Sequence, residues 1–231
     1  MRAFFNQLLT KSPLCLCCGY QKNYKHGFCL GCYHDLPHIK TPCLQCGLPL
    51  KTNTPCTCKA EDWPFAACLS AFAYQFPINE LLFQYKSQAR LALCDSFAQA
   101  LITQIKKQQH PLPQVLMPVP LHPNKLKQRG FNQSLELAKA LSKQLHIPID
   151  YHSLQSSQQT TQQKSLNKQQ RLVNVQSSYA LTRPLSVTHI ALIDDVITTG
   201  ATTKTLAYLL REHGATQIQA WSIARTASFN S

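Results

Sequence analysis

Residues 190–203 read Ile-Ala-Leu-Ile-Asp-Asp-Val-Ile-Thr-Thr-Gly-Ala-Thr-Thr, and this stretch decides the fold class. Its four leading apolar residues predict a short strand of a parallel sheet that is covered on both faces. Asp194 and Asp195 follow at the carboxyl end of that strand, where open α/β sheets bind their ligands. Hydroxyl groups, backbone amides and a glycine free to adopt positive φ make residues 198–203 a predicted phosphate-binding turn at the start of a helix. A strand, turn and helix cap without a ligand is the alternative.

The same run resembles the ribose-diphosphate binding loop of the type I phosphoribosyltransferases. In that family two acids contact the ribose hydroxyls, directly or through magnesium, and the Thr/Gly turn surrounds the 5′-phosphate of phosphoribosyl diphosphate (PRPP). The resemblance implies that Asp194 and Asp195 bind the ribose and that Mg²⁺ accompanies the ligand. It assigns the 5′-phosphate to Thr198, Thr199, Gly200, Ala201, Thr202 and Thr203.

Hydrophobic periodicity predicts strands and helices in alternation along the rest of the chain. Strands are expected at 67–74, 114–119, 147–154, 190–194 and 218–224. Helices are expected within 78–109, with a break near 87–90, along the apolar stripe 131–145, and from about 206 to a stop at Gly214. This order predicts a mostly parallel sheet with helices on both faces.

The turn Val119-Pro120-Leu121-His122 follows the strand expected at 114–119. By its place and its Val-Pro-Leu context it resembles the turn with which type I phosphoribosyltransferases hold the diphosphate, which implies that Pro120, Leu121 and His122 line that part of the site. The cations that follow, Lys125, Lys127 and Arg129, could neutralise a leaving diphosphate. A solvated basic segment leading into a helix capped by Asn132 is an equally good interpretation.

Enzymes of this fold carry a mobile lid where this chain has a glutamine-rich stretch, residues 155–170. Lys164, Arg171 and Asn174 are the residues expected to close over a ligand. An inert flexible loop is the alternative.

Cysteine carries the second strong signal, because eight of the eleven cysteines form four close pairs near the start of the chain. Two CxxC pairs can present four thiolates to Zn²⁺, and the metal allows a small segment to fold with little core of its own. One zinc site is predicted at Cys15, Cys18, Cys29 and Cys32. A second, less regular one is predicted at Cys43, Cys46, Cys56 and Cys58, where the last pair has CxC spacing. Disulfides are the alternative, but residues 1–11 do not read as a secretory signal.

Composition divides the chain into two predicted domains, a cysteine-rich zinc module at 1–62 and an α/β domain at 63–231. No apolar run is long enough to span a bilayer, so a cytoplasmic protein is expected. The 23 Lys and Arg against 10 Asp and Glu give a formal charge of +13, which predicts attraction to polyanions.

Basic and aromatic residues are interleaved in the zinc module, namely Lys22, Lys25, Lys40, Lys51 and Lys59 with Tyr20, Tyr24, Phe28 and Tyr33. Such a surface could stack on the unpaired bases of single-stranded nucleic acid. Packing of the aromatic rings against the zinc knuckles is the alternative.

Together these features resemble the ComF family of bacterial competence proteins. The resemblance rests on the paired cysteines, the Val-Pro-Leu turn, the run 129–133, Arg171 with Asn174, and the Asp-Asp-Thr-Thr-Gly loop, and it covers nearly the whole chain. It implies a cytosolic role in natural transformation, in which incoming single-stranded DNA is received at the inner membrane. Single-stranded DNA and other DNA-uptake machinery at that membrane are therefore the expected partners.

Two functions stay open. One is a PRPP-binding protein that also binds single-stranded DNA, and the other is a working phosphoribosyltransferase of nucleotide salvage with an appended zinc module. No residue is singled out as catalytic, and no pocket signature identifies an acceptor.

Overall fold

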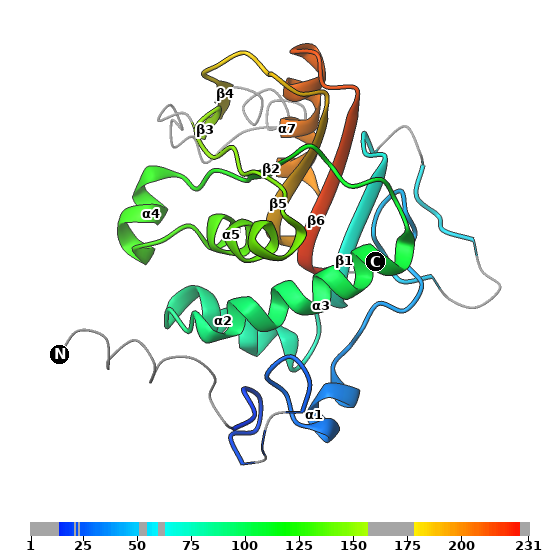
Figure 1. Ribbon diagram of the computed structural model, residues 1–231, viewed down its shortest axis with the longest axis vertical. Helices are drawn as coiled ribbons and strands as arrows, with labels where there is room; N and C mark the ends of the chain where they lie inside the picture. Colours follow the sequence, from blue (N-terminus) through cyan, green and yellow to red (C-terminus); the bar gives the residue numbers. More distant parts are fainter. Residues whose placement is uncertain are drawn as a thin grey trace, which may run out of the picture.

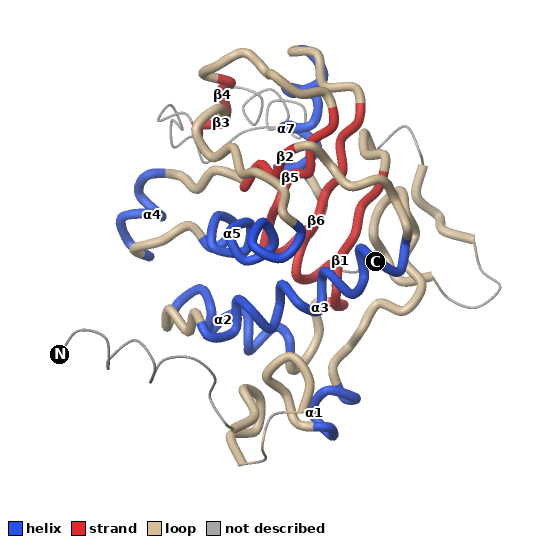
Figure 2. The backbone as a smooth tube through the Cα atoms, viewed as in Figure 1, coloured by secondary structure: helices blue, strands red, loops and turns tan. Residues whose placement is uncertain are grey.

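The computed structural model describes residues 14–20, 22, 24–50, 55–59, 63–156 and 178–226. Within these ranges the centre of the molecule is a four-stranded parallel sheet with the strand order β1-β6-β5-β2 (Figures 1 and 2). The strands are β1 (Ala67–Ala73), β2 (Val115–Pro118), β5 (His189–Ile197) and β6 (Gln217–Arg225). β5 lies in the interior of the sheet, so the run that suggested the fold is also at its centre.

Helices cover both faces of this sheet, which confirms the predicted fold class (Figure 1). One face carries α2 (Ile78–Ser87), α3 (Ala92–Gln108) and α5 (Gln133–Leu145), and the other carries α7 (Ala201–Glu212). Alternate side chains of a strand point to opposite faces. Accordingly, Ala191 and Ile193 of β5 are buried with α3 and α5, whereas Ile190 and Leu192 are buried with α7.

The strand predicted at 147–154 is wrong for most of its length. Ile149 makes one isolated parallel bridge with Leu116 of β2. Pro148 has no N–H to donate and contributes its carbonyl, which accepts from the Leu116 amide at 2.9 Å, so the ladder does not extend. The chain then forms β3 (Leu154–Ser156), which pairs antiparallel with β4 (Tyr179–Leu181) outside the main sheet.

Two smaller differences from the sequence prediction concern the carboxyl ends of β2 and β5. The basic segment after His122 is itself a short helix, α4 (Pro123–Arg129), which ends at Gly130 with φ +82°. β5 continues to Ile197, so the two acids lie within the end of the strand and do not follow it. The predicted cap of α5 is present, because the Asn132 side chain accepts from the amides of the first helical turn.

The cysteine-rich segment packs directly against the α/β core. Its first half, which contains α1 (Leu30–Asp35), buries Leu16, Phe28 and Leu36 in the same apolar cluster as α3. Its second half buries Cys46 in the cluster on the opposite face of the sheet. In Figure 1 the dark-blue first half therefore lies below α2 and α3, and the later, lighter-blue to cyan part lies beside β1. No helix within the described ranges is both long enough and apolar enough to cross a membrane.

Candidate functional site

Two carboxylates lie at the carboxyl end of β5. Asp195 is buried and its Oδ2 contacts the ammonium group of Lys86 from the last turn of α2. Asp194 is partly exposed, and its Oδ1 accepts a hydrogen bond of 3.2 Å from the hydroxyl of Ser134, in the first turn of α5. Carboxylate oxygens suit Mg²⁺ or the hydroxyls of a sugar.

The charges around Asp194 affect its protonation. Removal from water raises the pKa of Asp194 to about 7, and the Lys86 charge and the Ser134 hydroxyl offset this only in part. Burial also lowers the pKa of Lys86, with Asp194 acting against it and Arg129 and Lys125 adding to it. A cationic surface from α2 and α4 therefore faces the acidic end of β5.

Sequence reasoning missed Lys86 and Ser134. Lys86 follows the buried Tyr85 at the end of an otherwise ordinary amphipathic helix, and periodicity gives such a residue no special status. Ser134 could have been found, because it lies two residues after the predicted Asn132 cap and so at a helix start near the sheet edge.

The Thr/Gly turn connects β5 to α7. Thr198 and Thr199 are exposed, and the Thr199 hydroxyl accepts from the Ala201 amide at 3.3 Å. Gly200 has φ +76°, which a glycine adopts without strain, and serves as the N-cap of α7. Thr203 is buried and its hydroxyl donates to the Gly200 carbonyl, whereas the Thr202 hydroxyl interacts with Tyr179 of β4. Exposed hydroxyls and the N-terminus of a helix thus meet at one place.

The Val-Pro-Leu turn lies beside the acids. The Val119 amide donates to the Ile193 carbonyl at 2.9 Å, and Asn132 Nδ2 donates to the Val119 carbonyl at 3.0 Å. His122 caps α4, where its Nδ1 accepts from the Asn124 amide at 3.2 Å. The structure therefore brings residues 120–122 to the same sheet edge as the acids and the Thr/Gly turn.

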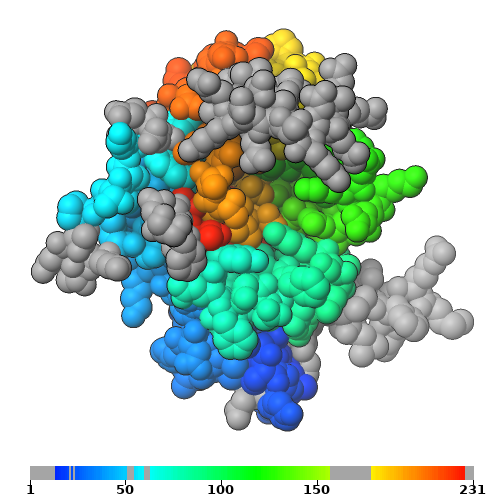
Figure 3. Space-filling view, turned by 180° about the vertical axis from the view of Figure 1, so that it is seen from behind, coloured from blue at the N-terminus to red at the C-terminus, as the bar shows by residue number. Residues whose placement is uncertain are grey.

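Arg129, at the end of α4, is partly exposed, and its Nη1 donates to Gln133 Oε1 at 2.5 Å. Lys125 and Lys127 are exposed on the same helix. Seen from behind, the surface is hollowed between the orange end of β5 and start of α7, the teal α2 and the green α4 region (Figure 3). A cavity of about 520 Å³ also adjoins the Val-Pro-Leu turn, lined mainly by proline, leucine and aromatic side chains. The expected lid residues Lys164, Arg171 and Asn174 lie outside the described part of the chain.

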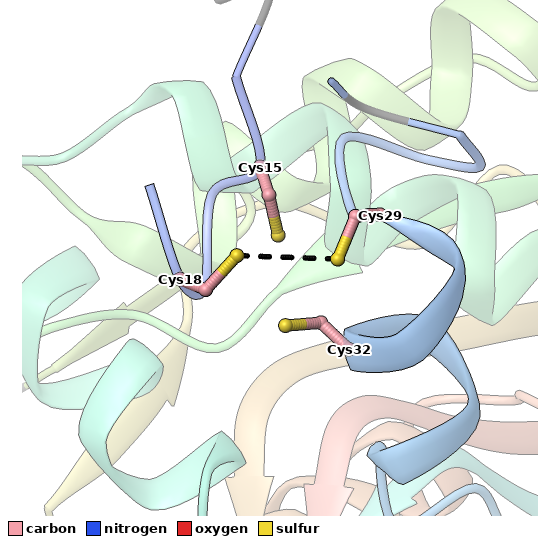
Figure 4. A group of neighbouring side chains, drawn as sticks. All are labelled: Cys15, Cys18, Cys29 and Cys32. Carbon is pink, nitrogen blue, oxygen red and sulfur yellow. Dashed lines mark hydrogen bonds between the residues drawn. The ribbon is translucent and has the colours of Figure 1, made fainter. Parts of the chain in front are cut away.

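The first four predicted zinc ligands, Cys15, Cys18, Cys29 and Cys32, converge on one point (Figure 4). Cys15 and Cys18 come from a loop, and Cys29 and Cys32 from the start of α1. The four sulfurs lie within 4.8 Å of one another, and Cys18 Sγ is 3.9 Å from Cys29 Sγ. A tetrahedral zinc with bonds of about 2.3 Å separates its sulfurs by about 3.8 Å.

The second set, Cys43, Cys46, Cys56 and Cys58, also converges within 4.8 Å. Its sulfurs are 3.7 Å apart between Cys43 and Cys58 and 3.5 Å apart between Cys46 and Cys56, so the CxC spacing does not prevent a four-sulfur site. All eleven cysteines are free of disulfides. Burial raises the pKa of the Cys46 thiol to about 11, so a bound cation is needed to keep it ionised. Both sets therefore have the donors and the spacing of a structural zinc site.

The aromatic residues of the cysteine-rich segment divide into two kinds. Phe28 is 1% exposed, and Tyr33 lies under the Lys25 ammonium, 4.8 Å from the ring centroid. Tyr20 and Tyr24 are 89% and 65% exposed. The described lysines of the predicted surface, Lys22, Lys25, Lys40 and Lys59, are all exposed. Lys51 lies outside the described residues. Two rings are thus free to stack, and two are not.

Comparison with known proteins gives concordant matches. Residues 132–228 match the phosphoribosyl transferase domain family. The DNA utilization protein YhgH of Escherichia coli (strain K12) is 30% identical over 226 residues, which cover 95% of this chain and 100% of that protein. Competence protein F of Haemophilus influenzae is 29% identical, over 87% of this chain and 91% of that protein. Competence protein ComFC of Streptococcus pneumoniae is 25% identical, over 94% and 91%.

Proposed function

The chain belongs to the ComF family of phosphoribosyltransferase-like competence proteins. We propose that it binds PRPP with Mg²⁺, and single-stranded DNA, in the cytoplasm during DNA uptake. The observation that carries the proposal is the meeting of two acids, a Thr/Gly turn and a cationic surface at one edge of the sheet. The acids suit the hydroxyl groups of a sugar, and the turn and the cations suit the phosphate groups attached to it.

Each part of PRPP would be bound by different residues. Thr198 and Thr199, with the backbone amides at the start of α7, would bind the 5′-phosphate. Asp194 and Asp195 would accept hydrogen bonds from the ribose hydroxyls. The diphosphate would lie toward residues 120–122 and the cations of α2 and α4, and Mg²⁺, when bound, neutralises part of its charge.

Single-stranded DNA would bind the cysteine-rich segment. Tyr20 and Tyr24 present exposed rings for stacking, and Lys22 and Lys25 lie beside them in sequence to pair with phosphates. A zinc ion in the first cysteine cluster, Cys15, Cys18, Cys29 and Cys32, would fix the loop that carries these residues. DNA-uptake machinery at the inner membrane would be the source of the strand.

A working phosphoribosyltransferase is the second candidate, favoured by the cavity of about 520 Å³ beside the Val-Pro-Leu turn. In that reaction an acceptor nitrogen would form a bond to C1 of the ribose as the bond from C1 to the diphosphate breaks. Positioning and charge compensation by this site would supply most of the rate. Diphosphate release in the presence of nucleobases and amines measures it.

Titration calorimetry with Mg·PRPP tests the binding proposal. Thr199→Val removes a charge-assisted hydrogen bond worth about 1.5 to 3 kcal/mol, so we expect about 10- to 150-fold weaker binding. Thr205→Val is the matched control, because the Thr205 hydroxyl donates to the Ala201 carbonyl within α7 and is not part of the turn. Equal affinities for the wild type and Thr199→Val would exclude the Thr199 hydroxyl as a phosphate ligand, and no heat from the wild type would contradict the binding proposal.

A further inference from the structure

Arg225, the last residue of β6, is fully buried and connects two segments that are far apart in sequence. Its Nε donates to the Cys46 carbonyl at 2.7 Å. Its Nη1 donates to the Ile197 carbonyl at 3.0 Å and also to the Thr198 carbonyl. Cys46 belongs to the second cysteine cluster, and Thr198 begins the phosphate turn. One rigid guanidinium therefore fixes the backbone of both.

Trp63 makes a second connection between the same two places. Its ring packs so closely on Gly200 that a Cβ at that glycine would be 2.7 Å from it. The Lys204 ammonium lies 3.8 Å from the ring centroid, and the guanidinium carbon of Arg225 lies 4.9 Å from it. The Trp63 carbonyl accepts from Gln45 Nε2 at 2.6 Å, and Gln45 lies between two cysteines of the second cluster.

The two clusters have different surroundings. The loop of the second cluster is also held by the Cys68 amide, which donates to the Leu44 carbonyl at 2.7 Å. Around the first cluster, Gly27 lies against Ser96 of α3, at the opposite face of the sheet. Figure 1 shows the two halves of the cysteine-rich segment at different sides of the core. Disturbing one cluster should therefore have a different consequence from disturbing the other.

From these contacts we infer that the second cysteine cluster stabilises the conformation of the proposed phosphate turn. Arg225 is the positioning residue that connects the cluster to the turn. A metal bound by Cys43, Cys46, Cys56 and Cys58 orders the loop 43–47. The ordered Cys46 carbonyl and the Trp63 ring then hold Arg225 and Gly200, which fix the conformation of residues 197–200. The identity of the ligand at that turn rests on the proposed function, whereas the structural coupling between the second cluster and the turn does not.

Hydrogen exchange of the zinc-loaded, full-length protein without ligand tests the coupling. The exchange rate of the amides of residues 196–204 is compared between the wild type, Cys58→Ser, and Cys32→Ser as the matched variant of the first cluster. We expect exchange about tenfold faster than in the wild type for Cys58→Ser, and within about twofold of it for Cys32→Ser. Equal exchange of this segment in both variants would overturn the inference.

Arg225→Lys serves if Cys58→Ser does not fold, because it leaves both clusters intact. The flexible ammonium group of a lysine cannot reproduce the planar set of N–H donors with which Arg225 binds the carbonyls of Cys46, Ile197 and Thr198. We expect the zinc content of the wild type together with faster exchange at residues 196–204. Unchanged exchange in a folded Arg225→Lys protein would refute the positioning role.

Mg·PRPP affinity, measured on the same proteins, separates this inference from the proposed function. If the wild-type protein binds no PRPP, the proposed function is contradicted. The hydrogen-exchange experiment then still decides whether the second cluster and the turn are coupled. If the wild type binds, we expect about tenfold weaker binding by Cys58→Ser and about twofold change at most for Cys32→Ser. Unchanged affinity in a Cys58→Ser protein that has lost one zinc would contradict the coupling.

Discussion

Lys86, at the end of α2, contacts the buried carboxylate of Asp195, at the end of β5. The pair joins the helical layer to the edge of the sheet at which β5 ends. A carboxylate at a buried position depends on such a partner, because an unpaired charge removed from water is costly. The same ammonium group is also available to an anionic ligand, since the Lys86 side chain keeps 26% of its surface exposed.

Lys86→Met should therefore lower both stability and PRPP affinity. Breaking a fully buried pair costs about 3 to 5 kcal/mol, and because Lys86 is partly exposed we expect a smaller loss, about 1 to 3 kcal/mol, in urea denaturation. Asp195→Asn in the Lys86→Met background is the control, because it removes the unpaired charge and should restore part of the stability. A Lys86→Met protein as stable as the wild type would show that the contact has no energetic weight.

Asp194 should make stability depend on pH. Its pKa of about 7 in the folded protein exceeds the ordinary 3.8 because burial disfavours the charged form. The folded state then binds the proton more tightly, so this contribution to stability is complete below about pH 4 and is lost as the pH rises through about 7. We expect Asp194→Asn to gain stability over the wild type, by at most about 4 kcal/mol, as the pH rises from about 4 to about 7. Urea titrations across this range measure the difference, and a constant difference would contradict the assignment.

Gly200→Ala should destabilise the Thr/Gly turn by more than its positive φ alone would cause. The alanine adopts positive φ at a cost of about 1 to 2 kcal/mol, and its Cβ also meets the Trp63 ring. Gly130→Ala is a matched control, because Gly130 has φ +82° but a Cβ added there would meet no atom within 4 Å. Thermal unfolding should show a larger loss for Gly200→Ala. Equal losses would mean that the Trp63 contact is unimportant.

Tyr20→Ala and Tyr24→Ala should each weaken binding of single-stranded DNA by about 1 to 3 kcal/mol, the usual worth of a base stacked on an aromatic ring. Lys22→Gln should reduce the salt dependence of log K by about 0.7, because one phosphate contact is lost. Tyr208→Ala, on α7 and also exposed, is the control. Fluorescence anisotropy with a labelled oligonucleotide measures all four variants, and DNA affinity unaffected by both Tyr20→Ala and Tyr24→Ala would place the strand elsewhere.

The sheet, and the meeting of the two acids with the Thr/Gly turn at its edge, could be predicted because their signals are local. Residues 190–193 are apolar throughout, as a strand covered on both faces requires, and the acids and the Thr/Gly turn follow directly in sequence. The strand expected at 147–154 does not form over most of that range, because Pro148 has no N–H to donate to a ladder although its neighbours are apolar.

The remaining features depend on contacts between distant segments. Lys86 lies far from Asp195 in sequence, and no residue type or spacing marks the pair. Arg225 follows the predicted end of its strand by one residue, and its role depends on the carbonyls of Cys46 and Ile197 reaching the same place. Every residue has a backbone carbonyl, so the pattern of side chains in the sequence cannot indicate which carbonyls accept from Arg225. Only the folded structure reveals this connection.

A crystal structure of the protein with Mg²⁺ and PRPP would decide whether this edge of the sheet is the PRPP site. We expect the 5′-phosphate on Thr198, Thr199 and the first amides of α7, with the ribose hydroxyls on Asp194 and Asp195. Saturating ligand bound elsewhere, with this turn vacant, would contradict the proposed site.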